Sequence, residues 1–232
     1  LLPMICLTYR FGAYASNVYA LVSEGYRAGG YNIQMFSDIL QSELQAQAQS
    51  ARGDVTIPHD EAAYERIRQT IAYKPETSWN YEVGTHLNLF DNQLHVDLAA
   101  YYMQVHNQQL SVLAGNYGFG RMMVNAGKSH SCGLEASVRG AALDNKLSYG
   151  MSYGLTIAKF GEYADSLSDG TVRSYKHNYV PFVPMHTLAA SADYRIDIDQ
   201  TQMLPTRGFT FRSVTVGLIL TAQGQTYWDE AN

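Results

Sequence analysis

The chain has 232 residues and a formal net charge of −5, and 46% of its residues are hydrophobic while only 16% are charged. Soluble domains carry roughly a quarter charged residues, and disordered chains and coiled coils are rich in charge. The low charged fraction therefore argues against both of these classes. The negative net charge argues against nucleic acid as the main partner. Tyr supplies 18 residues, an excess that suits a boundary between apolar and wet surroundings. No stretch approaches the roughly 20 apolar residues of a spanning helix, so any membrane span must be built from strands.

Residues 5–11 and 18–26 are predicted strands. In the second strand the sequence does not decide which side faces the apolar surroundings. The chain begins without an initiator Met or a secretory leader, and we expect it to be an internal piece of a longer protein. A connection of about 50 residues follows the second strand, forming a loop insert over about 27–76. Connections of this length are either functional or disordered.

The insert has helical content of its own. Phe36, Leu40 and Leu44 repeat at four-residue spacing after Ser37-Asp38, which is compatible with a capped amphipathic turn or two. A second such segment follows Asp60, with its apolar residues at Tyr64, Ile67 and Ile71, before Pro75 ends the insert.

The clearest strands lie within 79–103 and flank Asp91-Asn92, a short turn signal. Pairing the strands about this turn places Leu87 opposite Val96 and His86 opposite Asp97. One face is then apolar and the other polar, as expected when one face meets lipid or a core and the other meets water. The apolar set is Tyr81, Val83, Leu87, Leu89, Leu94, Val96, Ala100 and Tyr102, and the polar set is Glu82, His86, Asn88, His95 and Asp97.

A second hairpin about Asp144-Asn145 divides in the same way, with Val138 opposite Met151 on the apolar face and Arg139 opposite Gly150 on the polar face. Glu135 and Ser137 join this polar face. Strands are also predicted over 186–195 and 211–222. Short and long connections alternate along the chain, which is typical of outer-membrane barrels. We therefore predict an all-β fold, an antiparallel transmembrane β-barrel seen in part, with about eight strands and long extracellular loops that carry short helices.

Four stretches resemble the TonB-dependent receptors of the bacterial outer membrane, particularly the siderophore-receptor-like branch. They are Ser23-Glu24-Gly25-Tyr26-Arg27-Ala28-Gly29-Gly30-Tyr31-Asn32, the lysine-proline-glutamate segment at 73–84, Asn125-Ala126-Gly127-Lys128 followed by Gly133-Leu134-Glu135, and 181–188. Glu24 stands where the family more usually has a basic residue. The resemblance implies that residues 1–232 are part of a 22-stranded barrel, as a fragment without the plug domain, its energy-coupling box or the closing strand.

The resemblance further implies uptake of a scarce nutrient, a ferric siderophore or related chelate, with cobalamin or a carbohydrate also possible. It implies a location in the bacterial cell outer membrane and partners that are membrane lipid, the small-molecule ligand and the TonB complex, reached through the plug domain. We predict no enzymatic activity and no cofactor, since no nucleophile elbow or ordered triad spacing occurs.

Candidate site residues fall into two sets. Residues on the predicted polar face would line the lumen: Glu82, His86, His95, Asp97, Glu135 and Arg139. Aromatic residues in the loops are candidates for ligand binding, because rigid rings suit flat organic chelates, although such rings also occur in membrane girdles. They are Tyr31, Phe36, Tyr117, Phe119, Tyr163, Tyr175 and Tyr179. His86, His95 and Asp97 could converge on a metal, but a wet lumen explains them without one, and we predict no metal site.

Two alternatives stay open. A passive outer-membrane pore or an adhesion-type barrel would need no plug and no energised transport. A soluble all-β binding domain would need a second sheet over the face that holds Leu87, Leu89, Leu94 and Val96.

Overall fold

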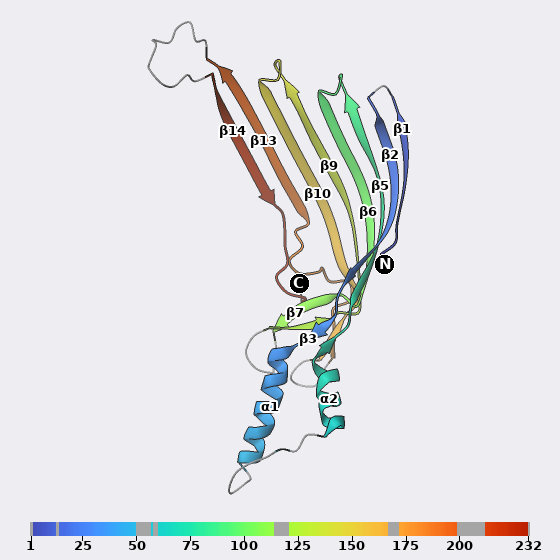
Figure 1. Ribbon diagram of the computed structural model, residues 1–232, viewed down its shortest axis with the longest axis vertical. Coiled ribbons are helices and arrows are strands. Elements are labelled where there is room, and N and C mark those ends of the chain that lie inside the picture. Colours follow the sequence, from blue (N-terminus) through green and yellow to red (C-terminus); the bar gives the residue numbers. More distant parts are fainter. Residues whose placement is uncertain are drawn as a thin grey trace.

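The computed structural model describes residues 2–12, 14–49, 57, 60–113, 121–166, 172–198 and 212–231. Its largest part is a curved antiparallel sheet in which each strand pairs with its neighbour along the chain, apart from small inserted elements (Figure 1). This confirms the predicted all-β class and the strand number. The sheet contains, in spatial order, β1 (Met4–Phe11), β2 (Ser16–Arg27), β5 (Glu76–Leu89), β6 (Leu94–His106), β9 (Lys128–Ala142), β10 (Leu147–Glu162), β13 (His186–Asp197) and β14 (Ser213–Gln223).

Small elements occupy the long connections, and all of them lie at one end of the sheet (Figure 1). Two helices extend furthest from the sheet, and three two-stranded ribbons lie nearer to it. We call this end the loop end and the opposite end the turn end. The elements are α1 (Ile33–Ala48), α2 (Glu61–Ile71) and the ribbons β3 (Gly30–Tyr31) with β4 (Ala72–Tyr73), β7 (Gln109–Leu113) with β8 (Arg121–Asn125), and β11 (Ala164–Ser166) with β12 (Val172–Ser174).

The two predicted turns set the register of the central strands. Asp91 and Asn92 have φ of 56° and 64°, and Asp144 and Asn145 have φ of 53° and 62°. Asp and Asn tolerate this left-handed backbone better than most residues, and two such residues in succession match the twist of a hairpin. Tyr14, in the neighbouring turn, donates a hydrogen bond to Asp91, which raises the pKa of the Tyr14 phenol. The turn between β13 and β14 lies largely outside the described residues.

The observed register confirms both predicted hairpins. Leu87 pairs with Val96 and His86 with Asp97, while Val138 pairs with Met151 in the second hairpin. The pairing of β6 with β9 extends the same division across the sheet. We refer below to the polar face, which carries Glu82, His86, Asp97, Glu135, Ser137 and Arg139, and to the apolar face, which carries Val83, Leu87, Val96, Leu134 and Val138.

The register also settles the facing of β2. Tyr19 pairs with Gly84 and therefore lies on the polar face, while Val18 and Val22 lie on the apolar face. The alternation of β2 was ambiguous because Leu21 shares the polar face with Tyr19, and Glu24 lies on the apolar face.

The apolar face stays exposed in the described part of the chain. Val83 is 59% exposed, and Leu134, Leu218 and Leu220 are each more than half exposed. Among the described residues, no second sheet packs over this face, because the other sheets are two-stranded ribbons in the connections. The described residues therefore do not supply the second sheet that a soluble sandwich would require.

The predicted helices form, with one difference in their bounds. The Asp60 carboxylate accepts a hydrogen bond from the Ala63 amide at 2.7 Å and caps α2, as expected. The first helix starts at Ile33, ahead of the predicted signal at Ser37-Asp38. Its N-cap residue, Asn32, makes no capping bond with its side chain, because the amide is used in contacts with other segments. Neither described helix is long and apolar enough to cross a membrane.

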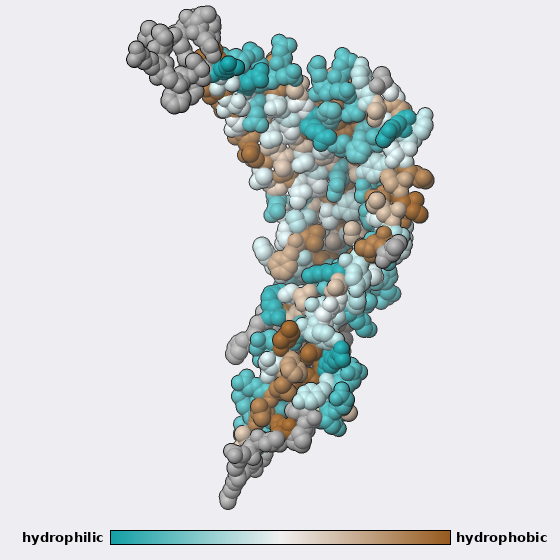
Figure 2. Space-filling view, viewed as in Figure 1, coloured by the Kyte–Doolittle hydropathy of each residue, from teal (hydrophilic) through white to brown (hydrophobic). Residues whose placement is uncertain are grey.

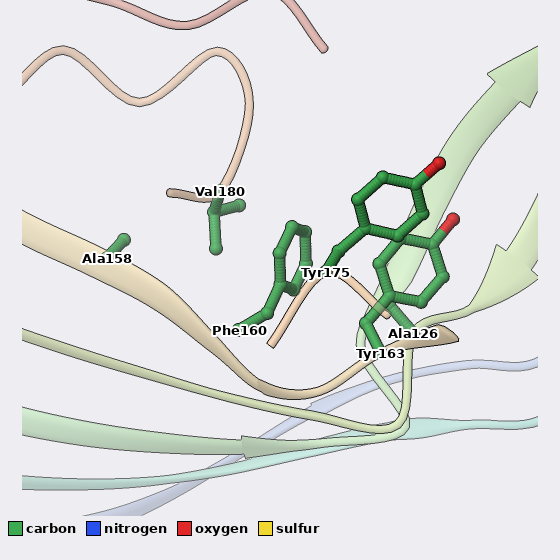
Figure 3. Packing of buried hydrophobic residues seen from close by; sticks show 6 residues of the cluster. All are labelled: Ala126, Ala158, Phe160, Tyr163, Tyr175 and Val180. Carbon is green, nitrogen blue, oxygen red and sulfur yellow. The ribbon is translucent and has the colours of Figure 1, made fainter. Parts of the chain in front are cut away.

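Most of the buried hydrophobic residues lie at the loop end. One cluster joins residues from β10 to the connections on either side, and Figure 3 shows the rings of Tyr163 and Tyr175 stacked beside Phe160. The rings of Tyr163 and Tyr175 are 5.2 Å apart between centroids, and Phe160 is fully buried. The cluster consists of Ala126, Ala158, Phe160, Tyr163, Tyr175 and Val180.

Two glycines on the polar face should differ sharply in their tolerance of a methyl group. A Cβ at Gly133 would collide with the Leu155 carbonyl and the Tyr101 ring, whereas a Cβ at Gly150 would have its nearest neighbour, Ser191 Oγ, at 3.6 Å. We expect Gly133→Ala to destabilise the purified protein by about 1–3 kcal/mol, the usual range for overpacking. Gly150→Ala is the matched control. Thermal unfolding followed by circular dichroism tests this prediction. Equal melting temperatures for the two variants would show that Leu155 and Tyr101 do not pack closely around Gly133.

Candidate functional site

A network of polar side chains crosses three strands on the polar face. His86 Nδ1 lies 2.7 Å from Asp97 Oδ1, and Ser137 Oγ donates to Asp97 Oδ2 at 2.9 Å. The nearest guanidinium nitrogen of Arg139 lies 3.7 Å from the same carboxylate oxygen. Three of the predicted lumen-facing residues therefore meet at one place, with Asp97 at the centre.

Tyr19 extends this network onto β2. Its hydroxyl donates to Glu82 Oε1 at 2.6 Å, and its ring stacks on the His86 ring with centroids 5.1 Å apart. Sequence reasoning missed Tyr19 because the facing of its strand was ambiguous. The remaining predicted residue of β6, His95, contacts Asn88 Oδ1 through Nδ1 at 2.6 Å.

Of these side chains, Tyr19, His86, Asp97 and Ser137 border a hollow of about 350 Å³ in the polar face. Glu135 reaches its rim without a hydrogen bond or an ion pair among the described residues. In the described part of the chain, no group of His, Cys, Asp and Glu side chains is arranged to hold a metal ion. The hollow suits contact with polar or positively charged groups. It is lined by Tyr19, His86, Asp97, Leu98, Ala99, Glu135, Ala136, Ser137, Ser152, Tyr153, Gly154 and Thr187.

Three amide side chains hold the loop end together. Asn32 bonds to the backbone of Met123 in both directions, accepting from its N–H at 2.8 Å and donating to its carbonyl at 2.9 Å. Asn125 does the same with the backbone of Lys74, at 2.7 and 3.0 Å. The buried Gln109 side chain donates to the carbonyls of Ala28 and Lys74. These bonds connect the loop insert to the β7–β8 ribbon.

The predicted ligand-binding aromatic residues do not share one surface. Tyr163 and Tyr175 are buried in the cluster described above, so little of either ring is left for a ligand. Tyr179 stacks on Tyr227 with ring centroids 5.0 Å apart, and the Lys159 ammonium lies 4.7 Å from its centroid.

Tyr31 and Phe36 line a separate hollow between the two helices. Tyr117 and Phe119 lie outside the described residues. Sequence reasoning missed the edge-to-face pair of Phe182 and Trp228, both largely exposed. No pattern linked these two rings, because they come from connections more than forty positions apart.

The amide contacts of Asn32 should hold the helices against the β7–β8 ribbon. We expect Asn32→Ala to raise the hydrogen-exchange rates of the α1 and α2 amides by about thirtyfold, since it removes at least two hydrogen bonds worth roughly 1 kcal/mol each. Gln34→Ala is the control, because within the described part of the chain the Gln34 side chain hydrogen-bonds only to Asp38 of its own helix. The sheet amides should not change in either variant. If both variants exchange alike at the helices, the contacts of Asn32 do not anchor them.

Comparison with known proteins gives both a family and a set of similar folds. A family model described as TonB dependent receptor-like, beta-barrel matches residues 1–232. The ferric yersiniabactin uptake receptor FyuA from Yersinia pestis aligns over all of this chain with a TM-score of 0.62 and 21% identity. The siderophore receptor PiuA from Acinetobacter baumannii covers 99% of this chain with a TM-score of 0.60 and 19% identity.

A third structure, the ferric preacinetobactin receptor BauA from Acinetobacter baumannii, covers 99% of the chain with a TM-score of 0.57 and 14% identity. At these identities the likeness establishes the fold alone. The chain spans 27% of the FyuA chain and 26% of each of the other two. A sequence search against proteins of curated function finds no match.

The family match covers the whole chain, and the sheet with its polar and apolar faces has the barrel fold of these receptors. This chain belongs to the TonB-dependent receptor-like β-barrel family, of which it forms part of a barrel wall.

Proposed function

We propose that this chain is a wall segment of an outer-membrane receptor that binds a ferric siderophore or related chelate and imports it with energy from the TonB complex. The family match over residues 1–232 carries the proposal. The names of the similar structures support the ligand class, since they describe a ferric yersiniabactin uptake receptor, a siderophore receptor and a ferric preacinetobactin receptor. No observation on the described residues favours a passive pore or an adhesion-type barrel.

In this proposal the apolar face contacts the lipid of the bacterial outer membrane. Exposed Val, Leu and Ile side chains on that face suit a hydrocarbon environment, in which each strand must hydrogen-bond to its neighbours. Exposed tyrosines lie near both ends of the strands, where the amphipathic ring suits the membrane interface. Tyr9 and Tyr194 lie near the turn end, and Tyr26, Tyr81 and Tyr102 nearer the loop end.

The polar face would line the lumen and contact the plug domain, through which the TonB complex acts. Glu82, His86, His95, Asp97, Glu135 and Arg139 are the candidate contact residues. The network around Asp97 holds several of these side chains in fixed orientations, which suits a surface that another domain packs against. We propose no covalent chemistry, no resident cofactor and no nucleic-acid partner for this segment.

Energised import separates the proposal from a passive pore. We expect cells that carry the complete receptor to accumulate radioactive iron from a matching ferric chelate, and to lose most of this uptake when TonB is removed. Binding of the chelate at the cell surface should be unchanged, because binding requires no energy. Uptake that continues without TonB would support the passive pore, and the absence of saturable binding to any chelate in a panel would exclude the iron assignment.

The loop insert should contribute to ligand capture without being needed for barrel assembly. Its ends lie side by side, since Tyr31 pairs with Ala72 and the backbone N–H of Asn32 donates to the Ile71 carbonyl at 2.8 Å. A deletion of residues 33–72 can therefore be closed by a short turn. We expect the deletion to weaken chelate binding while the receptor still assembles in the outer membrane. A receptor that no longer assembles would show that the insert is structural.

A further inference from the structure

The hollow between the two helices combines apolar walls, aromatic rings and one cation. It measures about 400 Å³ and lies where α1 and α2 join the β3–β4 ribbon, since its lining residues come from β3, from α2 and from the start of α1. Figure 2 shows hydrophobic side chains gathered on the surface over the helices in this region. We call it the helix hollow, and it is lined by Tyr31, Ile33, Phe36, Tyr64, Arg68 and Ile71.

Arg68 is the only charged residue among those lining residues. Its Nε donates to the Tyr31 hydroxyl at 3.1 Å, and its guanidinium carbon lies 5.7 Å from the centre of the Tyr31 ring. Within the described part of the chain, no carboxylate forms an ion pair with Arg68. The guanidinium is charged, as arginine always is in proteins, and the bond to Tyr31 raises the pKa of Arg68 further. Its terminal N–H groups are left for a partner that the described residues do not supply.

The lining residues are held in place before any ligand arrives. Tyr31 is fixed by its pairing with Ala72, and the next residue, Asn32, bonds to Met123 of the β7–β8 ribbon. Met35, Ile67 and Ile71 form a buried cluster between α1 and α2, and Ile71 of this cluster also lines the hollow. A site with its side chains already ordered loses less conformational entropy on binding.

We propose that the helix hollow binds a flat aromatic group that carries an anionic oxygen, such as a phenolate or carboxylate group of the substrate. The planar guanidinium of Arg68 can donate two parallel N–H groups to a carboxylate, or one to a phenolate oxygen. The opposite charges strengthen these hydrogen bonds. Exposed rings of Tyr31 and Tyr64 offer stacking or edge contacts to a ring. A cationic group would be repelled by Arg68, and a neutral aliphatic group would leave its N–H groups without an acceptor. The biological role of the site rests on the proposed import function.

The test compares two arginines on the same helix. Arg68 lines the hollow, whereas the exposed Arg66 does not, so Arg68→Gln and Arg66→Gln remove the same charge from α2. The complete receptor in detergent is titrated with iron-free 2,3-dihydroxybenzoate and followed by ligand-observed NMR. Cyclohexanecarboxylate, which lacks the aromatic ring, and benzamide, which lacks the charge, serve as comparison ligands.

We expect the native receptor to bind 2,3-dihydroxybenzoate more tightly than either comparison ligand. Arg68→Gln should weaken this binding by about tenfold, as expected for one charge-assisted hydrogen-bonded contact, and Arg66→Gln should leave it unchanged. Tyr31→Phe keeps the ring but removes the hydroxyl that orients Arg68, and should give a smaller loss. Because Tyr31→Phe is a smaller change than Arg68→Gln, weaker binding in both variants would not be explained by misfolding of Arg68→Gln alone.

Three results would overturn the proposal: no saturable binding to the native receptor, equal effects of the two arginine variants, or equal binding of cyclohexanecarboxylate. Because the probe contains no iron and requires no transport, these results are independent of the uptake experiment. Failure of uptake with intact binding of the probe would count against the import function and not against the site.

Discussion

The two-residue periodicity of the strands, fixed in register by short turns, is the constraint on which the rest of the structure depends. A slip of one residue would move every side chain of a strand to the opposite face. The Asp-Asn turns at 91–92 and 144–145 have a left-handed backbone, and in each turn the preceding residue, Phe90 or Leu143, is left-handed as well. The turns prevent such a slip, because this backbone fixes a tight hairpin. As a result, charged residues from β5, β6 and β9 gather on one face, and exposed aliphatic residues gather on the other.

The loop end is held together differently, because side-chain amides there connect short ribbons and helices that do not pair with the large sheet. Asn32, Asn125 and Gln109 each bond to backbone groups of a segment distant in sequence. These bonds connect the helices to the ribbon formed by β7 and β8, and through it to the sheet. Ligand-binding loops need ordered side chains on flexible connections, and such amide contacts provide that order without a large hydrophobic core. Asn32, which makes one of these contacts, directly follows Tyr31 of the helix hollow.

Much of the wall could be predicted from the sequence, because alternation and turn chemistry are local. The pairing of Leu87 with Val96 and of His86 with Asp97 follows from the turn alone. The facing of β2 could not be predicted, since the apolar Leu21 lies on the polar face together with Tyr19. Only the pairing of β2 with β5 shows which side of the strand is polar. The start of α1 was misjudged because Asn32 bonds to Met123, far along the chain. The burial of Tyr163 and Tyr175 depends likewise on contacts with Phe160 and Ala126, which no local pattern indicates.

The measurement that tests the account most directly compares two adjacent alanines of β6 in the complete receptor. Ala100 lies on the apolar face opposite Val83, and Ala99 lies on the polar face opposite Gly84. After the exposed Cys6 and Cys132 are replaced by Ser, a nitroxide is attached at each position in turn, in receptor reconstituted into lipid bilayers. Collisions with oxygen, which is enriched in lipid, are compared with collisions with a water-soluble nickel chelate. The account predicts that oxygen dominates at position 100 and does not at position 99. Equal accessibility at the two positions, or the reverse order, would contradict the assignment of the two faces.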